Sequence, residues 1–176
     1  FIALANKALD SGYKFIIILS GLTKDLRKQT HDRLDNGFFG FNTEYASIMD
    51  SEHMLPLGKI RQEQKIKRPN TLTNSSLNGD LSTSILRGAI NFQTDDAKLF
   101  CIKKNKTSLQ NIISYILKDP NVSSEIEIDY SNFKFKKLSK IKDQPILIID
   151  DEVDHASVDT GMKALDEEDN PNEEYN

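Results

Sequence analysis

Four acidic residues and a histidine closely follow an apolar run late in the chain. The sequence reads Ile146-Leu-Ile-Ile-Asp-Asp-Glu-Val-Asp-His155, so carboxylates come at the point where a buried strand would end. In open parallel sheets, ligands bind beyond the carboxyl ends of the strands. A carboxylate there can hold Mg²⁺, usually through water, and a second carboxylate can orient and deprotonate an attacking water. The cluster therefore predicts metal-assisted hydrolysis.

The order of the acids suggests a role for each. We expect Asp151 to hold the metal and Glu152 to activate the water. Asp150 either joins the metal shell or only ends the strand. Asp154 and His155 are expected to couple the site to a neighbouring domain or to nucleic acid. A strand often ends in Asp because its carboxylate caps the following turn, but three successive acids and then Asp-His exceed that need.

Three short apolar runs predict the strands that would position this cluster. None of them alternates between apolar and polar residues, which is typical of strands covered on both faces of a parallel sheet. The runs are 14–21, 98–102 and 144–149. Helical patterns lie between them at 24–36, with Thr23 as the N-cap, and at 108–118. Strands that alternate with helices predict an α/β fold with right-handed crossovers and helices on both faces of the sheet.

Composition narrows the class of protein. The chain has 176 residues, of which 38% are hydrophobic and 28% charged, and its net charge is −4. These values are typical of a soluble globular domain and exclude a wholly basic wrapper of nucleic acid. No apolar run approaches the ~20 residues of a membrane span, so no membrane partner is expected. The single cysteine, Cys101, lies in an apolar stretch, which predicts a buried, reduced thiol and a cytoplasmic location.

Composition also suggests where the domain ends. We expect one domain over residues 1–160 and an acidic linker or tail over 161–176. Residues 69–84 are rich in Asn, Thr and Ser, which is typical of an exposed connection or insertion. His31 and His53 have no second ligand at metal spacing, so both are interpreted as surface residues.

The acidic cluster also carries a resemblance to a known family. Ile148-Ile-Asp-Asp-Glu-Val-Asp154 resembles motif II of superfamily-two helicases, the DEAD-like box. The blocks that carry a narrower resemblance are 8–21, 26–35, 37–38, 102–106 and 148–157, roughly half of the chain. In this order they resemble the Z-one (Z1) domain family of prokaryotic proteins. Its members are helicase-like ATPases, often labelled endonucleases, and are linked to restriction and to defence against phage and mobile elements.

The resemblance implies a partial RecA-like motor domain that hydrolyses ATP with Mg²⁺ and acts on nucleic acid, with DNA expected. Asp151 and Glu152 would form its hydrolytic box. Ser20 and Gly21 match the helicase motif whose loop contacts the nucleic-acid backbone, where amides and a hydroxyl bind phosphate without reading bases. The same surface is expected to continue along the next helix through Arg27, Gln29 and Thr30.

One departure from the family pattern is large. Such ATPases need a glycine-rich loop ending in Gly-Lys-Ser/Thr to cradle the phosphates, and this sequence has none. The chain begins at Phe1 within a helical pattern, so we expect the loop upstream and interpret the chain as an internal fragment. The second motor domain of such ATPases, which carries an arginine finger, is also absent from this sequence. Loss of that finger alone costs about 10³–10⁵ in rate. The fragment by itself is therefore expected to be inactive.

Two other functions remain open. In a metal-dependent endonuclease, Asp150, Asp151, Glu152 and Asp154 would gather one or two divalent ions, with Lys103 or Lys104 as a partner. In a non-catalytic interaction domain, the acidic site would be degenerate. The sequence does not predict the oligomeric state.

Overall fold

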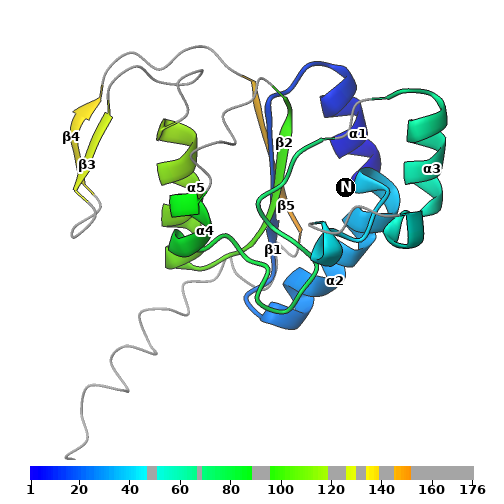
Figure 1. Ribbon diagram of the computed structural model, residues 1–176. Coiled ribbons are helices and arrows are strands. Elements are labelled where there is room, and N and C mark those ends of the chain that lie inside the picture. Colours follow the sequence, from blue (N-terminus) through cyan, green and yellow to red (C-terminus); the bar gives the residue numbers. More distant parts are fainter. Residues whose placement is uncertain are drawn as a thin grey trace, which may run out of the picture.

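The computed structural model describes residues 1–46, 51–66, 69–88, 96–118, 126–129, 134–138 and 145–151 (Figure 1). The α-helices are α1 (Ile2–Asp10), α2 (Lys24–Leu34), α3 (Pro56–Glu63), α4 (Thr83–Gly88) and α5 (Lys106–Lys118). The strands are β1 (Phe15–Ser20), β2 (Lys98–Lys103), β3 (Ile126–Asp129), β4 (Lys134–Leu138) and β5 (Ile146–Asp150). Shorter helical turns are η1 (Asp35–Phe39), η2 (Thr43–Tyr45) and η3 (Ser51–His53). Among these residues, no helix is both long and apolar enough to cross a membrane.

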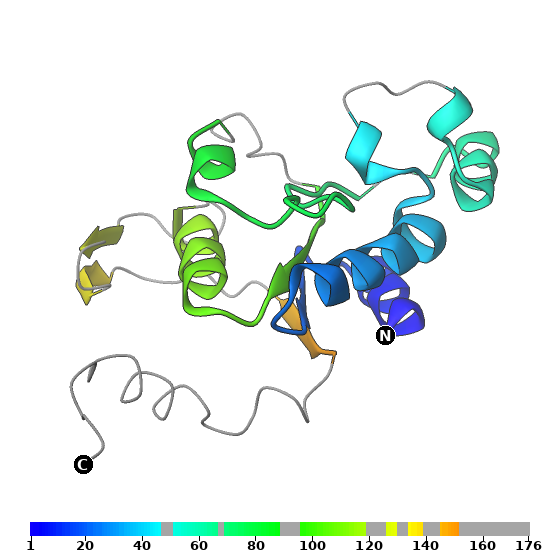
Figure 2. The same ribbon diagram turned by 90° about the horizontal axis from the view of Figure 1, so that it is seen from below.

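The central sheet is parallel and has the order β2-β1-β5. Phe15 at the start of β1 aligns with Lys98 of β2 and with Ile146 of β5, so the three strands begin and end nearly together. Strands β3 and β4 form a separate antiparallel hairpin beside α5 (Figures 1 and 2). The predicted α/β class with a parallel sheet is confirmed.

Helices cover both faces of the sheet (Figure 2). Successive strand residues point to opposite sides, and in β1 and β2 the residues on both sides are apolar. On one face, β1 and β2 pack against α1, α2 and η1. The buried residues there are Ala5, Ala8, Ile16, Ile18, Leu34, Phe38, Phe39, Leu99 and Cys101. On the other face, the same two strands pack chiefly against α5. The buried residues there are Phe15, Ile17, Leu81, Phe100, Ile102, Ile112 and Ile116.

Strand β5 differs from the sequence prediction. It was expected to be buried on both faces, yet within the described residues it is an edge strand. Leu147 and Ile149 pack against the α1–α2 side, but Ile146 and Ile148 on the α5 side are 38% and 60% exposed. The physical reason is that α5 lies over β2 and β1, and no described element covers β5 on that face. The prediction of two-sided burial for this strand is therefore wrong for the described part of the chain.

Helix α2 starts as predicted and ends differently. The Thr23 side chain accepts a hydrogen bond from Leu26 N at 3.2 Å, which confirms Thr23 as the N-cap. From its pattern the helix was expected to end at residue 36. Instead it widens into the π-helical turn η1 and ends at Gly40, whose φ of +78° favours glycine. A Cβ at Gly40 would also collide with the backbone of Gly58, so this turn and the start of α3 require close approach.

Residues 69–82, here called the strap, run along the outer edge of β2. Asn70 N donates to Ala97 O at 3.0 Å, and Leu99 N donates to Asn70 O at 2.9 Å. Farther along, Cys101 N donates to the hydroxyl of Thr73 at 3.1 Å. The side chains of Thr73 and Leu81 are buried. The expectation of an exposed connection at 69–84 is therefore wrong for most of this segment, because its hydroxyl groups satisfy the edge of β2.

Candidate acidic site at the carboxyl edge of the sheet

The acidic residues lie at the edge where all three parallel strands end. Strands β1, β2 and β5 finish there at Ser20, Lys103 and Asp150. Helices α2 and α5 start from the same edge, and Figure 2 views the molecule from this side. The backbone of Asp151 extends the ladder beyond β5, since Asp151 N donates to Leu19 O at 2.9 Å. The strands thus place Asp151 beside the end of the central strand.

Asp151 is held by helix α2. The hydroxyl of Thr30 donates to Asp151 Oδ2 at 3.2 Å, and Thr30 is only 5% exposed. Within the described residues, the other carboxylate oxygen of Asp151 has no hydrogen-bond partner. Asp151 itself is half-buried, so this second oxygen can face a ligand.

Asp150 has a different environment. Lys104 Nζ lies 2.5 Å from Asp150 Oδ1, and the lysine side chain is only 9% exposed. Asp150 shares the α5 side of the sheet with Ile146 and Ile148, whereas Asp151 turns toward α2. The two neighbouring carboxylates therefore diverge.

This divergence decides which residue fits a metal. Mg²⁺ is commonly bound through one or two carboxylates, with water and substrate phosphates filling its other positions. Asp151 fits this role, because one of its oxygens is fixed by Thr30 and the other is open. Asp150 fits less well, because Lys104 already neutralises it and it points to the other face. In the described part of the chain, no three His, Cys, Asp or Glu side chains gather as a metal site.

Three predicted members of the site lie outside the described residues. They are Glu152, Asp154 and His155. The roles assigned to them, water activation and coupling, remain predictions.

The predicted nucleic-acid residues are mostly buried. Ser20 is fully buried, and its hydroxyl donates to Ile102 O at 2.9 Å. Arg27 is also fully buried, and its guanidinium donates to the carbonyl oxygens of Asn74, at 2.8 Å, and Ser76. These two side chains therefore bind the protein's own backbone. In this conformation both side chains face the interior of the protein, and the nucleic-acid contacts expected of them stay predictions.

The other three residues of this predicted surface differ in exposure. Gly21 is buried, and Thr30 points inward to Asp151. Gln29 is exposed. The reason is helical geometry: α2 lies flat on the sheet, so Arg27 and Thr30, three positions apart, share its inner side. Of the three α2 residues, Gln29 alone keeps an accessible side chain.

A buried polar network behind the edge was missed by sequence reasoning. His31, interpreted as a surface residue, is fully buried. Its Nδ1 lies 3.2 Å from Asp35 Oδ1, and its Nε2 lies 3.1 Å from the hydroxyl of Thr73 in the strap. Thr43 donates to the same Asp35 carboxylate at 2.8 Å. The spacing of His31 and Asp35, four positions apart on a helix that leads into Phe38-Phe39, was the available signal.

A second anchor joins the strap to the carboxyl edge. Asp80 accepts a hydrogen bond from the hydroxyl of Ser108 at 2.7 Å and lies 3.7 Å from Lys103 Nζ. Lys24, in the first turn of α2, donates to Asn78 at 2.8 Å. The strap thus contacts the end of β2 and the starts of α2 and α5.

The predicted core thiol is confirmed. Cys101 is fully buried in the α1–α2 face. The pKa of this thiol is raised to about 12, chiefly by burial; Arg27 and a hydrogen bond with Ser20 act to lower it, and the charges of Asp80 and Asp151 act to raise it. A thiol with such a pKa stays protonated at neutral pH and is a poor nucleophile.

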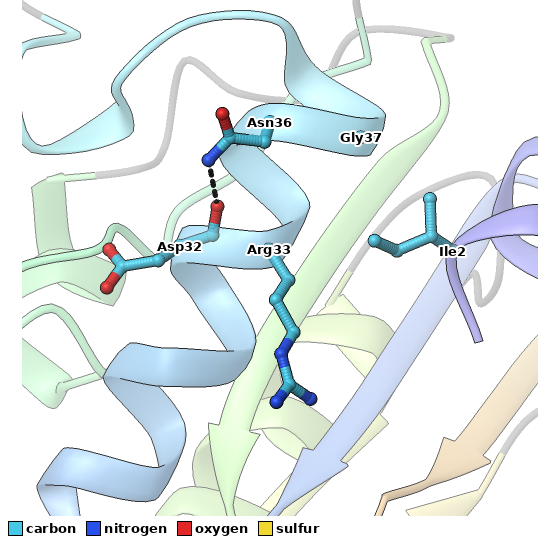
Figure 3. A pocket seen from close by; sticks show the side chains of 5 residues that line it. All are labelled: Ile2, Asp32, Arg33, Asn36 and Gly37. Atoms are coloured by element: carbon cyan, nitrogen blue, oxygen red, sulfur yellow. Dashed lines mark hydrogen bonds between the residues drawn. The ribbon is translucent and has the colours of Figure 1, made fainter.

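A shallow pocket of about 430 Å³ lies at the other end of α2, away from the acidic edge (Figure 3). Its lining residues are Ile2, Asp32, Arg33, Asn36 and Gly37. The amide of Asn36 donates to Asp32 O at 2.8 Å, and this contact is drawn as a dashed line. None of the predicted site residues lines this pocket.

Comparison of the chain with protein-family models, with curated proteins and with solved structures finds no match. The chemistry of the carboxyl edge is therefore what indicates a function for this chain. In the described residues that edge offers one fixed and accessible carboxylate, Asp151, and a second carboxylate neutralised by Lys104. Such an arrangement can hold a hydrated divalent cation and orient it toward a phosphate ligand.

Proposed function

We propose that this chain is part of a helicase-like, nucleic-acid-dependent ATPase, in which Asp151 holds Mg²⁺ and Glu152 activates the attacking water. The observation that carries this proposal is the position of Asp151. It lies directly after a parallel strand, beside the end of the central strand, with one carboxylate oxygen fixed by Thr30 and the other open. This is the edge at which α/β proteins bind their ligands.

The chain's own residues would contribute orientation and proton transfer. Asp151 presents a carboxylate oxygen whose direction is set by Thr30. Glu152, one residue later, would accept a proton from water. A bound Mg²⁺ would supply charge stabilisation for the transferring phosphoryl group. The phosphate cradle would come from a glycine-rich loop elsewhere in the intact protein.

The nucleic-acid partner, with DNA proposed, would meet the loop that follows β1. Because Ser20 and Arg27 are committed to internal hydrogen bonds and Gly21 is buried, contact there would use the exposed residues Leu22 and Thr23 and the exposed side chain of Gln29. Such contacts bind the sugar–phosphate backbone without reading bases. Participation in restriction or in defence against phage and mobile elements rests on the resemblance to the Z-one domain family.

Substitutions in the intact protein test this proposal. Glu152→Gln should lower ATP hydrolysis by about 10²-fold or more, the usual contribution of a general base, while binding of a fluorescent ATP analogue survives. Asp151→Asn should lower the rate of ATP hydrolysis and weaken the dependence of the remaining rate on Mg²⁺ concentration. Asp32→Asn is the matched control, because this acid pairs only with Lys28 on the exposed side of α2 among the described residues. Unchanged hydrolysis in Asp151→Asn would refute the proposal.

A metal-dependent endonuclease is the second candidate. It is favoured by the 2.5 Å contact between Lys104 and Asp150, which puts a lysine beside a carboxylate at the same edge. The divergence of Asp150 from Asp151 argues against both ligating one ion. Cleavage of DNA by the intact protein with Mg²⁺ and without ATP, lost in Asp151→Asn, would establish the endonuclease instead.

A further inference from the structure

The contact between Thr30 and Asp151 joins two parts of the sequence that are far apart. Thr30 lies in the second turn of α2, and Asp151 follows β5. The hydroxyl of Thr30 donates to Asp151 Oδ2 at 3.2 Å, and no other hydrogen bond to this carboxylate comes from the described residues. A threonine hydroxyl has one proton to donate. In a helix it often donates that proton to its own backbone, but here Asp151 receives it.

The Thr30 hydroxyl is held firmly in place. Three residues earlier, Arg27 donates to carbonyl oxygens of the strap, and the next residue, His31, contacts both Asp35 and Thr73. Thr30 itself is only 5% exposed, between α2 and the sheet. Because Arg27 and His31 anchor this part of α2 and Thr30 is buried, the position from which the hydroxyl donates to Asp151 is set by the helix. The contact therefore selects one side-chain conformation of Asp151.

We infer that Thr30 is a positioning residue, which orients the Asp151 carboxylate so that its second oxygen faces the metal. This inference rests on the proposed metal-binding role of Asp151. Partners that orient a metal ligand typically matter by about 10- to 100-fold in metal affinity or activity. Without the hydroxyl, the carboxylate rotates among several conformations, and the metal must select the productive one. The loss is therefore expected in metal affinity and less in nucleotide affinity.

The experiment uses the intact protein with ADP and measures Mn²⁺ binding by electron paramagnetic resonance. Thr30→Val keeps the shape of the side chain and removes the donor, so Mn²⁺ affinity should fall by about 10- to 100-fold. Thr30→Ser keeps the hydroxyl and should retain most of the affinity. The Mg²⁺ concentration that half-saturates ATP hydrolysis should shift in the same order. If Thr30→Val does not fold, Thr30→Ala, which removes the same donor, takes the place of that variant in the experiment.

Thr23→Val is the matched control. It removes the N-cap of the same helix, where Thr23 accepts from Leu26 N, but Thr23 does not contact Asp151. A lower melting temperature with unchanged Mn²⁺ affinity is expected for this variant. Equal loss of Mn²⁺ binding in Thr23→Val and Thr30→Val would overturn the inference, since stability of α2 would then explain both.

The outcomes separate this inference from the proposed function. If Asp151→Asn loses Mn²⁺ binding while Thr30→Val binds it like the unaltered protein, Thr30 has no positioning role and the proposed function stands. If Asp151→Asn binds Mn²⁺ and hydrolyses ATP normally, the proposed function itself is wrong. Loss of Mn²⁺ binding in Thr30→Ser as severe as in Thr30→Val would also overturn the inference, because the hydroxyl would not be what matters.

Discussion

The buried hydroxyl of Thr73 offers a sharp test of how the strap is held. Replacing it by valine keeps the shape of the side chain and leaves no cavity. The change removes the acceptor for Cys101 N, at 3.1 Å, and the partner of His31 Nε2, also at 3.1 Å. Both of these groups are fully buried, so water cannot replace the lost contacts. Thr71, which also contacts the Thr73 hydroxyl, keeps a second partner in the carbonyl oxygen of Thr73.

The size of the effect follows from these two groups. A buried polar group left without a partner costs about 1–3 kcal/mol, so two of them cost about 2–6 kcal/mol. The methyl group that replaces the hydroxyl recovers up to about 1 kcal/mol through burial. We therefore expect Thr73→Val to lower the free energy of unfolding by about 3 kcal/mol. For a domain of this size that is a fall of roughly 6–12 °C in melting temperature.

Urea unfolding followed by circular dichroism measures this change directly. The midpoint should fall, while the dependence of the free energy on urea concentration stays constant. Thr107→Val is the matched control, because Thr107 is exposed on α5 and its side chain has no hydrogen bond within the described residues. This control should stay within about 0.5 kcal/mol of the unaltered protein. A loss below about 1 kcal/mol in Thr73→Val would refute the reasoning, since the strap hydroxyl would then not satisfy buried groups.

Two further predictions concern the thiol and a tight turn. Because the pKa of Cys101 is raised to about 12, well above the value of about 8.5 in an unfolded chain, folding favours the neutral thiol. The contribution of this shift to stability is complete below about pH 8.5 and is lost as the pH rises toward 12. Because the folded thiol stays protonated at pH 8.5, iodoacetamide at that pH should label Cys101 only after unfolding in urea. Fast labelling of the folded protein would contradict this. Gly40→Ala should lower the free energy of unfolding by at least about 2 kcal/mol, because φ is +78° and the new Cβ collides with Gly58. Gly12→Ala is its control: φ is +82° in open space, so denaturation should show only the backbone cost of about 1–2 kcal/mol, and equal losses would exclude the collision.

Local patterns were enough to predict the three strands of the parallel sheet and the start of α2. The apolar run of β1 and the capping residue Thr23 are properties of neighbouring residues, and both are confirmed. The burial of Cys101 also follows from its apolar neighbours. Whether a strand is central or at an edge depends on elements distant in sequence. The apolar run of β5 therefore predicted its existence correctly and its two-sided burial wrongly.

The same limit explains the errors along α2 and the strap. Arg27 and His31 look like surface residues in a polar helix, and both are buried because the strap, more than forty positions later, supplies their partners. The Asn, Thr and Ser content of the strap is typical of exposed loops. Here these short polar side chains act as hydrogen-bond partners for a strand edge. For the candidate site, the sequence predicted Asp151 at the carboxyl edge, but the contact with Thr30 requires knowing how α2 lies on the sheet.

The strap also determines which edge of the sheet can accept a further strand. It seals the outer side of β2 with contacts such as those of Asn70 and Thr73, so no further strand can align there. Within the described residues, the outer side of β5 has no strand beside it. Of the two outer edges of this sheet in the described part of the chain, only that of β5 is therefore open to an additional strand. A strand added there would lie beside Ile148 and Asp150. The same addition would therefore enlarge the sheet and enclose the acidic edge.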